Sequence, residues 1–162
     1  MQGETAASAR AGAGAAAICL DFASDPMAVR GALESVLEAL CAGGVAADDR
    51  ALAEILLAEV LNNVVEHAYE HRGGWIAVAA TIDSGADGNV QALRFTVQDW
   101  GRPMPGGTLP DGTLPPSDEG GPPEGGFGWH LIRALASGLD YWREGGCNWF
   151  QFSLKAEQKT PI

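Results

Sequence analysis

Between Arg102 and Gly125 the chain carries 13 glycine or proline residues in a run of 24. Proline has no backbone N–H to donate, and glycine loses more conformational freedom on ordering than any other residue. No helix or strand is therefore expected in this run. A loop of this length is uncommon in a compact domain unless it has a function.

Before this loop, two segments have the signals of helices. Ser24-Asp25-Pro26 supplies a cap and a first-turn proline for a helix that runs to about Cys41. A second helix is expected from about Asp48 to about His71. On a helical wheel its polar and apolar side chains separate, so its apolar side must be core. The apolar set is Leu57, Val60, Leu61, Val64, Val65 and Ala68, and the polar set is Glu59, Asn62, Asn63, Glu66, His67 and Glu70.

Strands are predicted on both sides of the loop, from their β-branched and alternating residues. They span residues 18–22, 75–82, 90–99, 139–144 and 148–154. A short third helix is expected over residues 129–137. Helices that precede an antiparallel-leaning sheet, with one more inserted before its last strands, favour an α/β fold of the α+β type. We expect a two-layer sandwich with a mixed, mostly antiparallel sheet and helices on one face.

Size and charge limit the function classes. A chain of 162 residues, 46% of them hydrophobic, is long enough for one domain. The 21 Asp and Glu against 10 Lys and Arg give a net charge of −11, which makes nucleic acids and anionic membranes poor partners. We expect one domain over residues 15–155, with a flexible lead-in at 1–14 and a tail at 156–162.

The three cysteines are widely spaced and form no CxxC motif, which argues against a disulfide framework or a zinc site and fits a reducing compartment. The chain begins without the basic and apolar pattern of a signal peptide, and no run of 18 apolar residues occurs in it. We therefore expect a cytoplasmic protein.

Three groups of residues could carry chemistry. Glu59 and Asn63 are four apart on the second helix, so a proton acceptor and an oxygen ligand for Mg²⁺ share one face. The alternative is a solvated helix face. Asp99 shares a strand face with apolar residues, where an ionised carboxylate needs a partner. An amine-bearing ligand could be that partner, and Gly101 would let a ligand approach the backbone. The alternative there is a turn-forming aspartate.

The third group is Gly126-Phe127-Gly128, which leads into the short helix. Backbone N–H groups at a helix N-terminus can bind phosphate. The pattern is neither a Walker A loop nor a Rossmann fingerprint, and the alternative is a flexible loop end.

In this order and spacing, these residues resemble the GHKL ATPases with their Bergerat nucleotide-binding fold, and among them most closely the bacterial anti-sigma-factor serine/threonine kinases. The matching segments are Glu59–Tyr69, Asp99–Gly101 and Gly126–Ile132. Asp140 and residues 146–150 also fit the family's C-terminal pattern. The resemblance covers about residues 15–155.

The resemblance implies roles for the catalytic end of the site. Asn63 would ligate the Mg²⁺ that bridges the ATP phosphates. Glu59 would orient or deprotonate the attacking hydroxyl. Gly126 and Gly128 would let the loop and helix end approach the phosphates, and residues 102–125 would be the ATP lid.

The resemblance also implies the recognition of the base and the partners. Asp99 would accept a hydrogen bond from the adenine amino group, with Gly101 giving the base room. The chain would be an ATP-dependent serine/threonine kinase that binds a sigma factor and phosphorylates a small antagonist (anti-anti-sigma) protein, plausibly as a homodimer.

Two alternatives stay open. The first is a nucleotide-binding regulator that sequesters a partner without phosphorylating it. The predicted lid favours it, since no Lys or Arg follows Arg102 up to Gly125, and Arg102 and Arg133 are the remaining candidates for a lid cation. The acidic residues of the lid are Asp111, Asp118, Glu119 and Glu124. The second, weaker alternative is a histidine-kinase catalytic domain, for which no helical hairpin with a phosphoacceptor histidine precedes Glu59.

Overall fold

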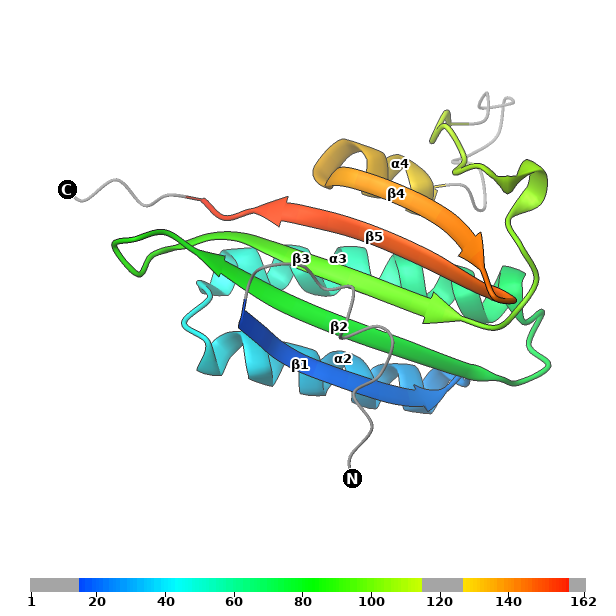
Figure 1. The fold of residues 1–162 in the computed structure, drawn as a ribbon, viewed down its shortest axis with the longest axis horizontal. Helices are drawn as coiled ribbons and strands as arrows, with labels where there is room; N and C mark the ends of the chain where they lie inside the picture. Colours follow the sequence, from blue (N-terminus) through cyan, green and yellow to red (C-terminus); the bar gives the residue numbers. More distant parts are fainter. Residues whose placement is uncertain (1–14, 115–126, 158–162) are drawn as a thin grey trace, which may run out of the picture.

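The structure is a computed structural model that describes residues 15–114 and 127–157 (Figure 1). Five strands form one sheet in the order β1-β2-β3-β5-β4, and every neighbouring pair is antiparallel. The strands are β1 (Ala15–Ala23), β2 (Trp75–Ser84), β3 (Val90–Asp99), β4 (Ser137–Glu144) and β5 (Cys147–Lys155). The predicted α/β two-layer fold is confirmed, and the described sheet is wholly antiparallel rather than mixed.

Three α-helices cover one face of this sheet. They are α2 (Pro26–Ala42), α3 (Ala47–Asn63) and α4 (Phe127–Leu135). Two short turns complete the described elements, the π-helix η1 (Val64–Ala68) and the 3₁₀-helix η2 (Pro105–Gly107). The predicted lead-in and most of the predicted tail, 158–162, lie outside the described residues, as do the second half of the predicted lid, 115–125, and Gly126.

Helix α2 begins where its cap predicts. The Asp25 carboxylate accepts hydrogen bonds from the backbone N–H groups of Met27 and Ala28, at 3.1 and 2.9 Å, and Pro26 occupies the first turn. Its buried residues recur at helical spacing, so α2 lies against the sheet along one stripe. They are Val29, Ala32, Val36 and Leu40.

The core lies between the helices and the inner face of the sheet. Alternate residues of the three central strands point into it, as a period of two requires. They include Ile76, Val78 and Ala80 from β2, Leu93, Phe95 and Val97 from β3, and Phe150, Phe152 and Leu154 from β5. Phe95 and Phe152 are register partners, and their rings stack with centroids 5.0 Å apart.

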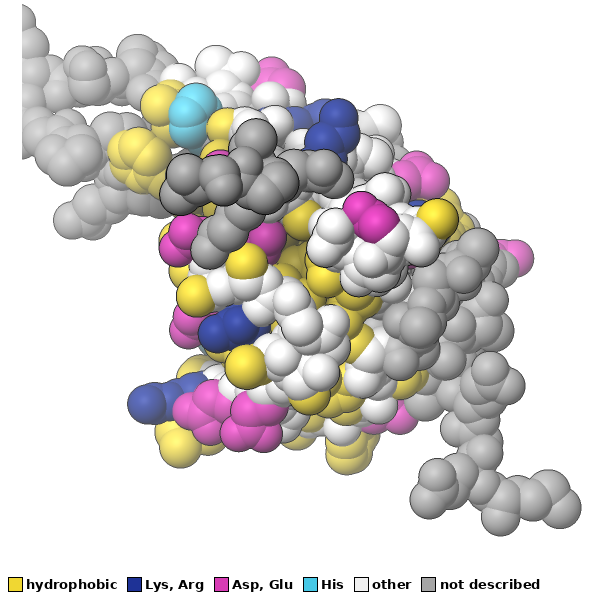
Figure 2. Space-filling view, turned by 90° about the vertical axis from the view of Figure 1, so that its left-hand side faces the viewer, with side chains coloured by type: hydrophobic (Ala, Val, Ile, Leu, Met, Phe, Trp, Pro, Cys, Tyr) yellow, Lys and Arg dark blue, Asp and Glu magenta, His cyan; other side chains and the backbone are white. Residues whose placement is uncertain are grey.

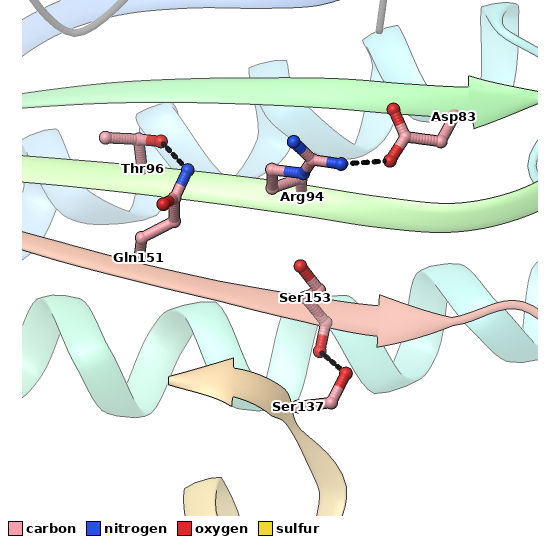
Figure 3. A network of polar contacts seen from close by, with 6 residues as sticks. All are labelled: Asp83, Arg94, Thr96, Ser137, Gln151 and Ser153. Atoms are coloured by element: carbon pink, nitrogen blue, oxygen red, sulfur yellow. Dashed lines mark hydrogen bonds and ion pairs between the residues drawn. The ribbon is translucent and has the colours of Figure 1, made fainter. Parts of the chain in front are cut away.

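The other face of the sheet carries polar pairs between neighbouring strands (Figure 3). Arg94 donates to Asp83 at 2.7 Å, and Gln151 donates to Thr96 at 3.4 Å. Acidic side chains are spread round the end of the sandwich that faces the viewer in Figure 2, as a net charge of −11 leads one to expect. Within the described ranges, no helix has both the length and the apolar character needed to cross a membrane.

The second helix differs from its prediction. Regular α-helix ends at Asn63 rather than near His71, and the chain continues as the π-helix η1, in which the N–H of Tyr69 donates to the carbonyl of Val64 at 3.1 Å. A π-turn inserts an extra residue and so rotates the side chains that follow. Val65 is consequently buried, whereas Val64 and Ala68 are only half-buried and line a cavity.

The third helix begins two residues earlier than predicted, at Phe127, and ends at Leu135. Strand β4 likewise begins earlier, at Ser137, across an irregularity in its pairing with β5. The end of the helix and the start of the strand thus both lie two residues earlier than predicted, and one residue still separates them.

η1 and the end of β3 approach each other closely. The N–H of Arg102 donates to the carbonyl of Ala68 at 2.8 Å. A Cβ at Gly101 would lie 2.5 Å from that carbonyl oxygen and 2.7 Å from its carbon. Glycine is therefore required at position 101 to bring the helical layer against the end of β3.

We expect Gly101→Ala to lower the free energy of unfolding by about 1–3 kcal/mol, because backbone atoms must move to accept the methyl group. Gly31→Ala is the matched control. A Cβ at Gly31, on the exposed side of α2, meets nothing within 4 Å, so this change should raise stability by about 0.5–1 kcal/mol. Urea denaturation followed by circular dichroism measures both. Equal effects of the two substitutions would contradict the close approach.

Candidate functional site

A cavity of about 770 Å³ opens between η1, the end of β3 and the start of β5. These elements meet at the right-hand end of the molecule in Figure 1. The segment after β3 forms another of its walls. Its apolar lining includes Val60, Val64, Met104, Trp129 and Phe150, and its polar lining includes Asn63, Asp99, Tyr141 and Asn148. A mostly apolar space with a few convergent polar groups is the usual form of a small-molecule site.

Asp99 is the buried charged group of this cavity, with 5% of its surface exposed. Its Oδ1 accepts hydrogen bonds from the N–H of Gly101 and from the side-chain amide of Asn148, both at 2.8 Å. Burial raises the pKa of Asp99, while these two hydrogen bonds and the charge of Arg143 act against that rise. Among the described residues no hydrogen bond reaches Oδ2, so this oxygen is available to a ligand.

In the helical layer, Glu59 and Asn63 of α3 lie close to Gly128 of α4. The Asn63 amide nitrogen is buried without a hydrogen-bond partner among the described residues, and Asn63 lines the cavity. A Cβ at Gly128 would lie 2.5 Å from Glu59 Oε2 and 3.7 Å from Asn63 Nδ2. The first turn of α4 therefore packs against the residues predicted to bind the metal and the attacking hydroxyl.

Glu59 itself does not line the cavity, because the start of α4 lies over it. Its carboxylate faces a helix N-terminus, where the helix dipole favours negative charge. The same position is favourable for a phosphate group, so a phosphate bound there would be a neighbour of Glu59. Gly126, the other glycine of the predicted pair, lies outside the described residues.

The described first half of the predicted lid lies on α4. Arg133 Nε donates to the carbonyl of Pro110 at 3.0 Å, and the His130 ring lies 3.3 Å from the carbonyl of Gly112. Arg102, which lines the cavity, pairs with Glu70. Both candidates for a lid cation, Arg102 and Arg133, thus already interact with other groups of the protein. His67 also lines the cavity, but its side chain is 73% exposed.

Three site residues were given no role from sequence. Asn148 occupies the first of the core-facing positions of β5, and the next three, Phe150, Phe152 and Leu154, are apolar. A polar residue at a core-facing position is the signal that could have identified it. Tyr141 and Arg143 approach it from β4, but their contacts depend on strand register, which a single sequence does not reveal.

A comparison with protein families matches residues 22–154 to a model described as the histidine kinase-like ATPase domain. Among solved structures, the RsbU and RsbW domains of Rv1364c from Mycobacterium tuberculosis match with a TM-score of 0.53 and 21% sequence identity. The match covers 89% of this chain and 33% of that chain, so this chain spans about a third of its length. At this identity the likeness concerns the fold alone. No curated protein sequence matches the chain.

The burial of Asp99 predicts a pH effect on stability. A carboxyl whose pKa is raised on folding binds its proton more tightly in the folded state, so its contribution to stability falls as the pH rises from its ordinary value of 3.8 through the raised value. Asp99→Asn removes that penalty. We expect the stability of the variant minus that of wild type to increase with pH over this window and then level off.

Urea denaturation at a series of pH values from about 4 to about 8 measures this difference. Asp87→Asn is the control, since Asp87 is exposed and hydrogen bonds hold its pKa below its ordinary value of 3.8, so its difference from wild type should stay nearly constant over this range. A decrease with rising pH in the stability of Asp99→Asn minus that of wild type would contradict the burial argument.

Proposed function

This chain belongs to the histidine kinase-like ATPase domain family, and we propose that the cavity beside Asp99 binds ATP within one domain over residues 15–155. The observation that carries the proposal is a buried carboxylate with one oxygen held by protein donors and the other left for a ligand. An ionised carboxylate accepts hydrogen bonds only, which suits the amino group of adenine. The apolar walls suit the faces of the purine ring.

The phosphates would extend from this point toward Asn63 and the start of α4. The Asn63 amide nitrogen is buried without a hydrogen-bond partner among the described residues, and the oxygen of the same amide is a suitable ligand for Mg²⁺. Asn63 is thus the residue that would hold the metal. Mg²⁺, when bound with ATP, would neutralise charge on the phosphates. Gly128, and by the sequence pattern Gly126, would admit the phosphates close to the backbone.

Glu59 is the proposed catalytic residue. It lies one helical turn before Asn63, where its carboxylate would orient or deprotonate the hydroxyl of a protein serine or threonine. Because the first turn of α4 packs over Glu59, that hydroxyl would reach it only after α4 or the lid shifts. Lid movements that complete a catalytic site are common in phosphoryl transfer.

We further propose an anti-sigma-type serine/threonine kinase that binds a sigma factor and phosphorylates a small antagonist (anti-anti-sigma) protein. The fold likeness to a chain with an RsbW domain supports it. A homodimer in the cytoplasm is part of the same proposal. The competing candidate is an ATP-binding regulator that sequesters its partner without phosphoryl transfer. The pairing of Arg102 with Glu70, in a lid whose later residues include no Lys or Arg, favours this second candidate.

ATP binding is expected to raise the melting temperature. A ligand at about 100 times its Kd adds about 2.7 kcal/mol to the stability of the folded state, which corresponds to roughly 5–10 °C for a domain of this size. Thermal unfolding with and without Mg·ATP should show this shift in wild type and lose it in Asp99→Asn. Asp21→Asn, which neutralises an exposed aspartate on β1, should keep the shift. Equal shifts in all three proteins would refute the assignment of Asp99.

Phosphoryl transfer is tested with γ-labelled ATP and a candidate small antagonist protein. Glu59→Gln should slow label transfer by about 10²–10⁴-fold, because it removes the proton acceptor, while the ATP-induced thermal shift remains. Glu54→Gln, at an exposed glutamate of the same helix, is the control. If wild type binds ATP but transfers no label, the regulator without kinase activity is the correct function. Unchanged transfer by Glu59→Gln would rule out its catalytic role.

A further inference from the structure

Asn148 makes four hydrogen bonds of 2.8 Å or less at the point where three strands meet. Its oxygen accepts from the Tyr141 hydroxyl at 2.8 Å and from Arg143 Nη1 at 2.7 Å. Its amide nitrogen donates to Asp99 Oδ1 and to the carbonyl of Arg102, both at 2.8 Å. With 4% of its surface exposed, Asn148 is a buried amide whose hydrogen-bonding capacity is fully used.

The register of the sheet creates this arrangement. Asp99 of β3 is the register partner of Asn148 of β5, and Asn148 is the register partner of Arg143 of β4. The three side chains therefore lie in one row across adjacent strands, on the face that carries the core. A shift of one residue in either pairing would send the Asn148 side chain to the other face of the sheet.

Arg143 determines which way the amide of Asn148 points. A guanidinium group donates hydrogen bonds and accepts none, so the atom of Asn148 that faces Arg143 must be the oxygen. The amide nitrogen is then directed at Asp99, where it meets an acceptor. The orientation of the amide thus follows from the chemistry of its neighbours.

The same network holds the beginning of the lid. Arg143 donates to the carbonyl of Gly101 at 3.0 Å, and the N–H of Met104 donates to the Tyr141 hydroxyl at 2.9 Å. Together with the bond from Asn148 to the Arg102 carbonyl, these contacts attach residues 101–104 to β4 and β5. Asp99 and the first residues of the lid are consequently positioned by one shared set of side chains.

We propose that Asn148, oriented by Arg143, is the positioning residue that fixes the Asp99 carboxylate. In this position the carboxylate favours a purine with an amino group at position 6 and disfavours a purine with an oxo group there. This inference rests on the proposed ATP binding. With Oδ1 held by two protein donors, the carboxylate presents Oδ2 to the ligand as an acceptor. An oxo group brings a second acceptor to that oxygen, and the two repel.

Asn148 also favours the ionised form of Asp99, since its hydrogen bond opposes the upward effect of burial on the pKa of that carboxyl. Removal of the amide raises the pKa further, and a protonated Asp99 is no longer a pure acceptor. The charged and titratable groups near Asp99 are Tyr69 and Arg143, with His67, Glu70 and Arg102 elsewhere on the cavity wall. The loss of affinity with falling pH should therefore begin at a higher pH in an Asn148 variant.

The test is calorimetric titration of ATP and GTP into wild type and variants across a series of pH values. Asn148→Ala should weaken ATP binding about tenfold or more, reduce the preference for ATP over GTP, and move the pH dependence upward. Asn148→Thr should recover part of the affinity, because a hydroxyl can donate to Asp99. Arg143→Met should show the same changes to a smaller degree. Because Arg143 is exposed, this variant provides the test if Asn148→Ala does not fold.

Gln151→Ala is the matched control. It removes an amide from the same strand, but one that bonds Thr96 on the other face of the sheet (Figure 3). It should bind both nucleotides as wild type does. Wild-type affinity, selectivity and pH dependence in the Asn148 and Arg143 variants would overturn the inference while leaving ATP binding intact. Failure of wild type itself to bind ATP would instead refute the proposed function, and the inference with it.

Discussion

A carboxylate at the buried end of a central strand is the constraint on which this end of the molecule depends. Asp99 points with the apolar residues of β3, where an ionised group without partners would cost several kcal/mol. β5 supplies an amide beside it, β4 supplies a guanidinium beyond that amide, and the chain turns at Gly101 so that its own N–H is donated as well. One oxygen atom of Asp99 thus accepts hydrogen bonds from Gly101 and Asn148, and Arg143 holds the amide that donates one of them.

The second constraint is the close contact between the helical layer and the end of β3. The π-turn η1 presents the carbonyl of Ala68 to the N–H of Arg102, and the absence of a side chain at Gly101 permits that distance. The same turn directs Val64 and Ala68 toward the cavity rather than the core. A regular helix through this segment would place these side chains differently, so the shape of the cavity depends on one irregular turn.

The two ends of the proposed site differ in whether their polar groups already have hydrogen-bond partners within the protein. Around Asp99 the protein donors are in place without a ligand, which is the preorganisation expected of a recognition site. Around Asn63 a buried amide nitrogen lacks a partner, and Glu59 is covered by the first turn of α4. In the proposed function, nucleotide binding would therefore need little rearrangement, whereas phosphoryl transfer would require α4 or the lid to shift.

The amino-acid sequence alone determined the layers of this protein and indicated several residues of the proposed site. Caps, helical spacing and strand alternation are local properties, so α2, the first part of α3 and every strand were predictable near their observed bounds. Glu59, Asn63, Asp99 and Gly128 could be selected because local spacing and order brought their chemistry together. Tertiary structure alone decided the π-turn after Asn63 and the roles of Asn148, Tyr141 and Arg143. Those features depend on strand register and on the approach of η1 to Gly101, which join residues far apart in the chain and leave no periodic signal in it.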